Sequence, residues 1–126
     1  MVDENERLTL ARAAALLECD ARTLQGWEEV DPPLGLAIQT EPEHPYRRGD
    51  LMAVACVPTS MIIGRAVLPE VMARHTGIPK DELLRLMRQG HLPTHRARDV
   101  SRPMMLITPL DVRRYLLTEY RKKHPL

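Results

Sequence analysis

The chain has 126 residues and a net charge of +1, and 44% of its residues are hydrophobic while only 3% are aromatic. It is long enough for one ordinary domain or two very small ones, with a core of aliphatic side chains and methionine. No apolar run approaches the roughly 20 residues that span a bilayer, and the N-terminus is acidic, so we expect neither a membrane protein nor a secreted one. Cys19 and Cys56 are interpreted as core residues in a reducing cytoplasm.

The charge is divided unevenly between the two halves of the chain. Residues 1–60 hold 5 Lys and Arg against 11 Asp and Glu, a net charge of −6, whereas residues 61–126 hold 13 against 6, a net charge of +7. An asymmetry of this kind indicates a nucleic-acid partner for the basic half. The alternative is that the basic residues only keep a surface solvated.

Two helices are predicted at the start of the chain. Residues 1–7 are polar and are expected to form a frayed terminus. Thr9 is expected to cap a helix over residues 10–17, because its hydroxyl can accept a hydrogen bond from a helix N–H. After a short turn, Asp20 is expected to cap a helix over residues 21–29, which the following prolines end. The helical spacing of this second helix turns two large apolar residues inward, Leu24 and Trp27.

Two strands and a third helix are expected next. Residues 35–39 and 46–48 are strand candidates, and the turn between them is rich in proline and acid. Asp50 is expected to cap a helix over residues 51–57, because a proline follows that stretch and cannot continue it.

The second half repeats the pattern of two helices. Residues 58–66 are interpreted as a junction, either irregular or with a strand at residues 61–63. Helices are then expected over residues 68–75 and 80–89, joined by a turn that contains a glycine and a proline. The inward side of the later helix is expected to be Leu83, Leu86 and Met87.

A basic hairpin is expected to follow. Residues 92–94 and 104–107 are strand candidates, and the tip between them carries three arginines, Arg96, Arg98 and Arg102. Thr108 and Pro109 form a helix start, a capping hydroxyl followed by proline at the first helical position. The last helix is therefore expected over residues 110–123.

The two halves look alike at an offset of 59 residues. Few residues are identical, so the evidence is the shared order of apolar and turn positions. The matched pairs are Ala14 with Ala73, Cys19 with Ile78, Leu24 with Leu83, and Trp27 with Leu86.

Short motifs in both halves are similar to those of a known group of proteins. In the second half, Gly77-Ile78-Pro79 keeps the group's turn glycine, and Gly90-His91-Leu92-Pro93 is similar to its link after the second helix. In the first half, Glu18-Cys19-Asp20 departs from the usual Gly-Val-Ser turn. The matching stretches there are Leu8-Thr9, Ala13-Ala14, Leu16-Leu17, Arg22-Thr23-Leu24, Trp27-Glu28 and Tyr46-Arg47-Arg48-Gly49-Asp50-Leu51. Together they resemble the winged helix-turn-helix domains of the MerR-like and phage excisionase-like superfamily.

The resemblance implies a fold that is mainly α with small β-hairpins, made of two tandem winged helix-turn-helix units over residues 1–60 and 61–126. It also implies binding to double-stranded DNA, with the second helix of a unit as recognition helix and the hairpin as wing. We therefore expect a sequence-specific regulator of transcription or of site-specific recombination that resembles the excisionases of mobile elements.

Most of the expected DNA contacts lie in the second unit. Arginine can fork to a guanine edge, lysine can hold a phosphate, and arginines on a wing suit phosphates or a narrow minor groove. The residues expected to bind DNA are Lys80, Arg85, Arg88, Arg96, Arg98 and Arg102. Further candidates in the first unit are Arg22, Gln25, Arg47 and Arg48.

Acidic residues surround the candidates of the first unit. Glu28 and Glu29 lie in the predicted helix over residues 21–29, next to Arg22 and Gln25. Glu41 and Glu43 lie in the turn between the two strand candidates, where DNA would repel them. The first unit is therefore interpreted as a module for protein binding or self-association, although both units could instead read successive grooves. A second hypothesis for the whole protein is an interaction adaptor or anti-regulator whose acidic half binds a protein partner.

No catalytic, cofactor or metal site is expected. His91 and His95 are four residues apart, but Pro93 between them excludes a helical metal-binding pair. The chain has no glycine-rich phosphate loop and no spacing that supports a Ser-His-Asp triad. We therefore expect a non-enzymatic cytoplasmic protein without a cofactor.

Overall fold

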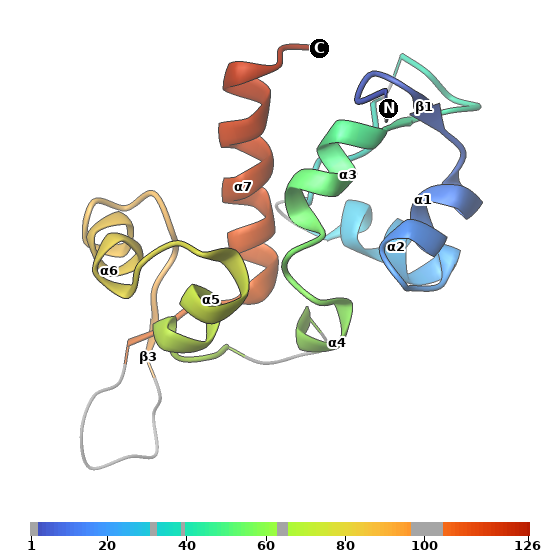
Figure 1. The fold of residues 1–126 in the computed structure, drawn as a ribbon. Coiled ribbons are helices and arrows are strands. Elements are labelled where there is room, and N and C mark those ends of the chain that lie inside the picture. Colours follow the sequence, from blue (N-terminus) through green and yellow to red (C-terminus); the bar gives the residue numbers. More distant parts are fainter. Residues whose placement is uncertain (1–2, 31–32, 39, 63–65, 97–104) are drawn as a thin grey trace. The chain divides into compact units, whose positions relative to one another are not determined.

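The computed structural model (Figure 1) describes residues 3–30, 33–38, 40–62, 66–96 and 105–126. The described chain is mainly helical with short antiparallel strand pairs, as the sequence predicts. It forms two compact units, here called the first unit, Met1–Ala55 with Leu116–Leu126, and the second unit, Cys56–Tyr115. The boundary therefore differs from the one predicted at residue 60, and the C-terminal residues belong to the first unit. None of the described helices is long and apolar enough to cross a membrane.

The helices of the first unit begin where local sequence signals place them. Its described elements are β1 (Arg7–Leu8), α1 (Leu10–Leu16), α2 (Ala21–Glu29), β2 (Tyr46–Arg47), α3 (Arg48–Val54) and the C-terminal part of α7 (Pro109–Lys123). The hydroxyl of Thr9 caps α1 by accepting from the Arg12 N–H at 3.3 Å. Asp20 stands at the N-cap position of α2, but its side chain makes no capping bond. Trp27 is only 8% exposed and Leu24 is fully buried, as predicted.

The strands of the first unit differ from the prediction. β2 forms where residues 46–48 predict a strand, but it pairs antiparallel with β1, with Arg7 opposite Arg47 and Leu8 opposite Tyr46. The N-terminal stretch is therefore tied into a strand pair, and the prediction of a frayed terminus is wrong for Arg7. Such short pairing depends on residues far apart in the sequence, which local patterns do not reveal.

The described part of residues 35–39 is not a strand. The backbone N–H groups of Gly35, Leu36 and Ala37 donate to the carboxylate of Glu28 at 3.0, 2.9 and 3.3 Å. The carboxylate therefore satisfies the donors that a neighbouring strand would otherwise satisfy. Leu36 and Ile38 are buried while Ala37 is partly exposed, so the burial alternates as it does in a strand although no strand forms in the described part of this stretch.

The region of residues 48–62 contains two helices that the sequence placed differently. α3 begins at Arg48, so Asp50 is not its N-cap but lies buried in its first turn. α4 (Thr59–Ile62) forms where an irregular junction or a strand was predicted, and Ile63 lies outside the described residues. α4 belongs to the second unit.

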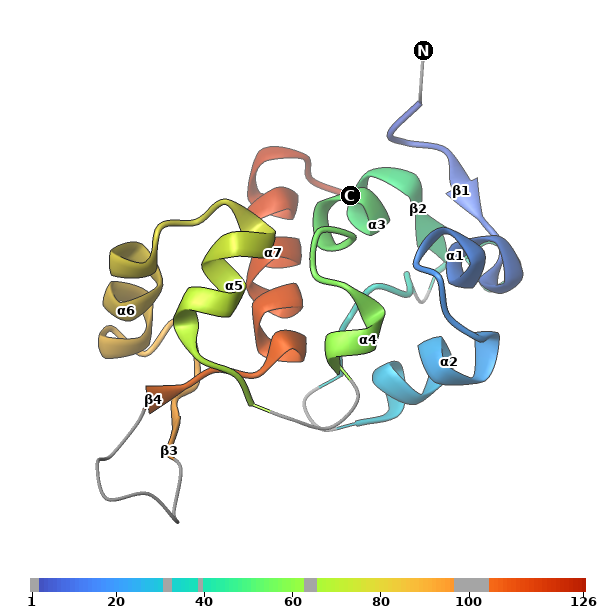
Figure 2. The same ribbon diagram turned by 60° about the horizontal axis from the view of Figure 1, so that its bottom comes forward.

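The second unit is built around a pair of helices joined by a tight turn. Its described elements are α4, α5 (Pro69–Thr76), α6 (Lys80–Arg88), β3 (His95–Arg96), β4 (Met105–Leu106) and the first part of α7. Helices α5 and α6 lie side by side (Figures 1 and 2). Gly77 ends α5 in the left-handed region with φ 76°, and its N–H donates to the carbonyl of Ala73. The predicted inward residues of α6 are all buried, namely Leu83, Leu86 and Met87.

The strand pair of the second unit is confirmed, with a shifted start. β3 and β4 pair antiparallel with His95 opposite Leu106 (Figure 2), whereas the first strand was predicted at residues 92–94. The N–H groups of His91 and Leu92 instead donate to the carbonyl of Leu86 at 2.9 and 3.3 Å, so the chain still wraps the end of α6 there. Residues 97–104, which hold most of the predicted tip, lie outside the described residues.

The offset of the predicted internal repeat is confirmed for two pairs of helices and for one pair of strand starts. Helices α1 and α5 begin at residues 10 and 69, α2 and α6 at 21 and 80, and strands β2 and β4 at 46 and 105, so each pair differs by the predicted 59 positions. The left-handed turn residues also match, because Glu18 has φ 57° and Gly77 has φ 76°. The turn that departs from the resembled motif therefore keeps the conformation that glycine favours.

Both cysteines were predicted to be core residues, but neither is fully buried. Neither forms a disulfide, Cys19 is partly exposed and Cys56 is exposed, so the interpretation as a core residue is wrong for Cys56. Met72 and Met87 are buried and fill core space in a chain without phenylalanine, as expected.

Candidate nucleic-acid interface

Helix α6 has one side buried in the core of the second unit and the other side exposed. Its start follows Pro79, and its buried residues share one side at helical spacing. Three cations lie exposed on the remaining surface of the helix, Lys80, Arg85 and Arg88. All three were predicted as DNA contacts, and the structure places them on one short helix.

Arg85 is engaged by residues of its own helix. Its Nε donates to Glu82 at 3.0 Å, and its Nη2 donates to the other oxygen of the same carboxylate. Its Nη1 donates to the side-chain oxygen of Gln89 at 3.0 Å. The hydrogen bond with Glu82 raises the pKa of Arg85 and lowers the pKa of Glu82, so both stay charged near neutral pH. These partners were not predicted, although their spacing of three and four residues is one at which helical side chains meet.

Lys80 links the start of α6 to α5. Its Nζ lies 2.6 Å from a carboxylate oxygen of Glu70, and both side chains are about half exposed. The hydrogen bond raises the pKa of Lys80 and lowers the pKa of Glu70. Pairing across ten residues has no local spacing signal, so this contact could not be predicted from the sequence.

Arg88 is the third cation of the helix. It lies in the last turn and is exposed, and it makes no hydrogen bond or ion pair with any other residue that the structure describes. A cation at the C-terminal end of a helix is also favoured by the helix dipole. Its guanidinium is therefore available to a ligand.

The start of the β3–β4 pair contacts the first turn of α7. Asp111, in the first turn of α7, accepts hydrogen bonds from the Thr108 hydroxyl and from Arg114, and His95 of β3 lies 3.5 Å from the same carboxylate. The predicted wing residue Arg96 lies in β3 opposite Met105. Arg98 and Arg102 lie outside the described residues.

The repeat allows a position-by-position comparison of α6 with α2. At 59 residues before Lys80, Arg85 and Arg88, the first unit has Ala21, Gly26 and Glu29. Glu29 is exposed, and its neighbour Glu28 holds the loop at residues 35–37. At these three positions the first unit therefore keeps the helix and lacks the cations.

The other candidates of the first unit fall into two groups. Arg22 and Gln25 are exposed on α2, as a surface role requires. Arg48 is partly exposed and pairs with Glu6 at 2.9 Å. Arg47 is only 2% exposed, so the prediction that it contacts DNA is wrong.

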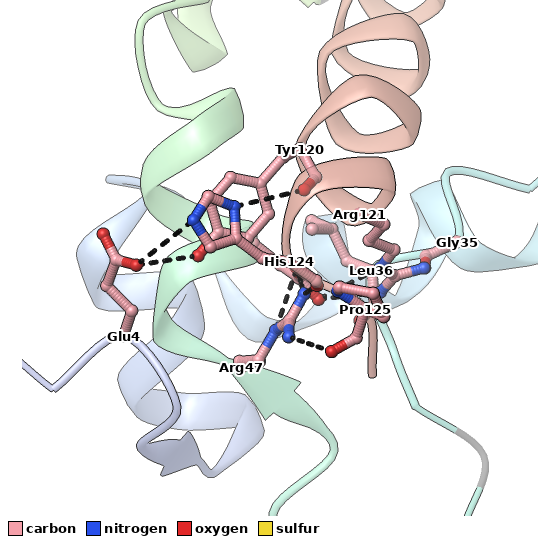
Figure 3. A network of polar contacts seen from close by, with 9 residues as sticks. Glu4, Gly35, Leu36, Arg47, Tyr120, Arg121, His124 and Pro125 are labelled. Atoms are coloured by element: carbon pink, nitrogen blue, oxygen red, sulfur yellow. Dashed lines mark hydrogen bonds and ion pairs between the residues drawn. The ribbon is translucent and has the colours of Figure 1, made fainter.

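Arg47 instead belongs to a buried network at the C-terminus of the first unit (Figure 3). Its guanidinium donates to Asp50 at 2.7 Å and to the main-chain carbonyls of His124 and Pro125 at 2.7 and 3.2 Å. Asp50 is fully buried and also pairs with Arg121 at 2.8 Å. Sequence patterns did not reveal this network, because they gave Asp50 a local capping role.

Arg121 extends the network to the loop that follows α2. Its Nη1 donates to the carbonyl of Gly35 at 2.8 Å, and its Nη2 donates to the carbonyl of Leu36 at 3.3 Å (Figure 3). Arg121 therefore joins the last turn of α7 to the loop that follows α2.

Metal-binding side chains do not gather in the described parts of the chain. No group of three or more His, Cys, Asp or Glu residues there could hold a metal ion. His91 is exposed, and His95 faces Asp111.

No protein-family model, curated protein or solved structure matches this chain.

Proposed function

We propose that the protein binds double-stranded DNA through α6 and the strand pair that follows it, as two tandem winged helix-turn-helix units of which the second reads the DNA. The observation that carries the proposal is the contrast between matched helices. Three exposed cations of α6 stand where α2 has alanine, glycine and glutamate. Two of the three buried positions of α6 are also buried in α2, whereas the third, Met87, stands where α2 has Glu28.

The size and charge of the second unit support this proposal. An α-helix fits the major groove, which is about 12 Å wide. The second unit holds 10 Lys and Arg against 5 Asp and Glu, a net charge of +5, whereas the first unit holds 8 against 12, a net charge of −4. A duplex carries one negative charge per about 1.7 Å of its axis, so it attracts the second unit and repels the first.

The strand pair gives a second surface for the backbone of the duplex. Its base is fastened by Asp111, and Arg96 lies in β3 before the predicted tip with Arg98 and Arg102. Arginines in such a position suit phosphates or a narrow minor groove. The resemblance to excisionases makes a non-enzymatic cytoplasmic regulator of transcription or of site-specific recombination the biological role that we propose.

The test is selection of bound sequences from a random duplex pool, followed by binding measurements with a selected and a scrambled duplex. We expect one enriched sequence, and an affinity that falls steeply with salt because bound counterions are released. A pool that shows no enrichment, with no duplex bound at low salt, would contradict the proposal.

The alternative function, an interaction adaptor or anti-regulator, is favoured by one observation. The exposed side of α2 carries Glu29, and the following turn exposes Glu41 and Glu43. An acidic surface of this kind suits a basic protein partner or a second copy of the chain. Under this alternative the protein binds no duplex at low salt, and replacement of Glu29 by lysine alters self-association in sedimentation.

A further inference from the structure

Arg85 differs from the other two cations of α6 in how it is held. Both oxygens of Glu82 accept from one side of its guanidinium, and the oxygen of Gln89 accepts from Nη1. Lys80 has one partner on another helix, and Arg88 has none among the residues described. Arg85 is therefore the cation whose orientation the helix itself fixes.

The hydrogen bonds within the helix leave part of the guanidinium available. The group has five N–H donors, and three are engaged, one each on Nε, Nη2 and Nη1. Two donors remain, one on each terminal nitrogen. A pair of donors on the two terminal nitrogens is what a bidentate contact with O6 and N7 of a guanine requires.

We infer that Arg85 reads a guanine in the major groove, and that Glu82 and Gln89 are positioning residues that hold its guanidinium for this contact. The inference rests on the proposed DNA binding and assigns the base contact within it. A side chain that is already ordered loses less conformational entropy when it binds. Lys80 and Arg88, which lack this support, are assigned to phosphates.

Glu82 provides the way to test the assignment, because its charge and its positioning role have opposite effects. A carboxylate near the duplex repels phosphates, so its removal strengthens binding to any sequence. If Glu82 positions Arg85, its removal also weakens discrimination between sequences. Asp81 is a matched control, because it is the neighbouring acid in the same helical turn and is exposed without a hydrogen-bond partner among the described residues.

The experiment compares the unmutated protein with Glu82→Gln and Asp81→Asn, using the selected duplex and the same duplex with each guanine replaced in turn. We expect both variants to bind the scrambled duplex at least as tightly as the unmutated protein. For Glu82→Gln we expect discrimination at one guanine to fall by about tenfold, the lower part of the range for a bidentate base contact. For Asp81→Asn we expect that discrimination to stay unchanged.

A double-mutant cycle completes the test. In the background of Arg85→Ala, which itself loses discrimination at the same guanine, Glu82→Gln should have no further effect on it. The inference is overturned if Glu82→Gln and Asp81→Asn behave alike, or if the lost discrimination maps to a base that Arg85→Ala leaves unaffected. Those results leave DNA binding intact, whereas failure of the unmutated protein to bind any duplex at low salt overturns the proposed function together with this inference.

Discussion

A single turn residue shows how the first unit departs from the second. Glu18 has φ 57°, in the left-handed region that the matching Gly77 occupies with φ 76°. A residue with a Cβ pays about 1–2 kcal/mol for this conformation, whereas glycine adopts it without that cost. The first unit therefore contains local strain that the second unit avoids.

Replacement of Glu18 by glycine should stabilise the first unit. We expect a gain of about 0.5–1 kcal/mol in the free energy of unfolding, because the relief of strain exceeds the added flexibility of the unfolded chain. Urea unfolding followed by the fluorescence of Trp27 measures it, since this tryptophan is the only one in the chain. Gly77→Ala is the converse control and is followed by circular dichroism, because Gly77 lies in the second unit; a Cβ there meets nothing within 4 Å, so any loss reflects the backbone alone. A loss of stability in Glu18→Gly would contradict the strain.

The buried carboxylate of Asp50 should contribute strongly to the stability of the first unit. It is fully buried between Arg47 and Arg121, so its removal leaves a buried guanidinium without its counter-ion. We expect Asp50→Ala to cost about 3–5 kcal/mol in the free energy of unfolding. Glu6→Ala breaks the more exposed pair with Arg48 and should cost less than about 1 kcal/mol. Equal losses of unfolding free energy in the two variants would show that the buried network stabilises the unit no more than the exposed pair does.

At the scale of elements, the helices could be predicted and the strands only in part. Helices α1, α2, α5 and α6 begin within one residue of prediction, because caps, prolines and helical spacing are local signals. The pairing of β1 with β2 is a contact between distant residues and has no such signal. The stretch at residues 35–39 shows the converse error, because a strand was predicted there and the described part forms none. The backbone N–H groups of residues 35–37 donate to the carboxylate of Glu28 instead.

The end of α7 should be required for the first unit to fold. A chain that ends at Tyr115 lacks the hydrogen bonds of Arg121 to Gly35 and Leu36, and the C-terminal carbonyls that accept from Arg47. We expect its Trp27 fluorescence to lose the cooperative unfolding transition of the full chain. A chain that ends at Pro125 is the control, since Leu126 is exposed. An unchanged transition midpoint in the shorter chain would mean that the first unit folds without this segment.

At the scale of the whole molecule, one repeated architecture carries two opposite charges. The charge asymmetry between the two halves could be counted from the sequence. The exposure of Lys80, Arg85 and Arg88 could also be predicted, because the helical spacing of the apolar residues fixes which side of α6 is buried. The partners of these cations and the burial of Arg47 could not be predicted, since they depend on three-dimensional neighbours. The candidate site was therefore predicted as a surface, but not as a set of contacts.

The central claim is that DNA binds the second unit and not the first. Arg88→Ala and Arg22→Ala test it directly, because each removes one exposed arginine from one of the two matched helices. The measurement is the affinity for the selected duplex at a series of salt concentrations. We expect Arg88→Ala to weaken binding and to flatten the slope of log K against log salt by about one, and Arg22→Ala to change neither. Equal effects of the two variants, or no binding of the unmutated protein to duplex at low salt, would contradict the claim.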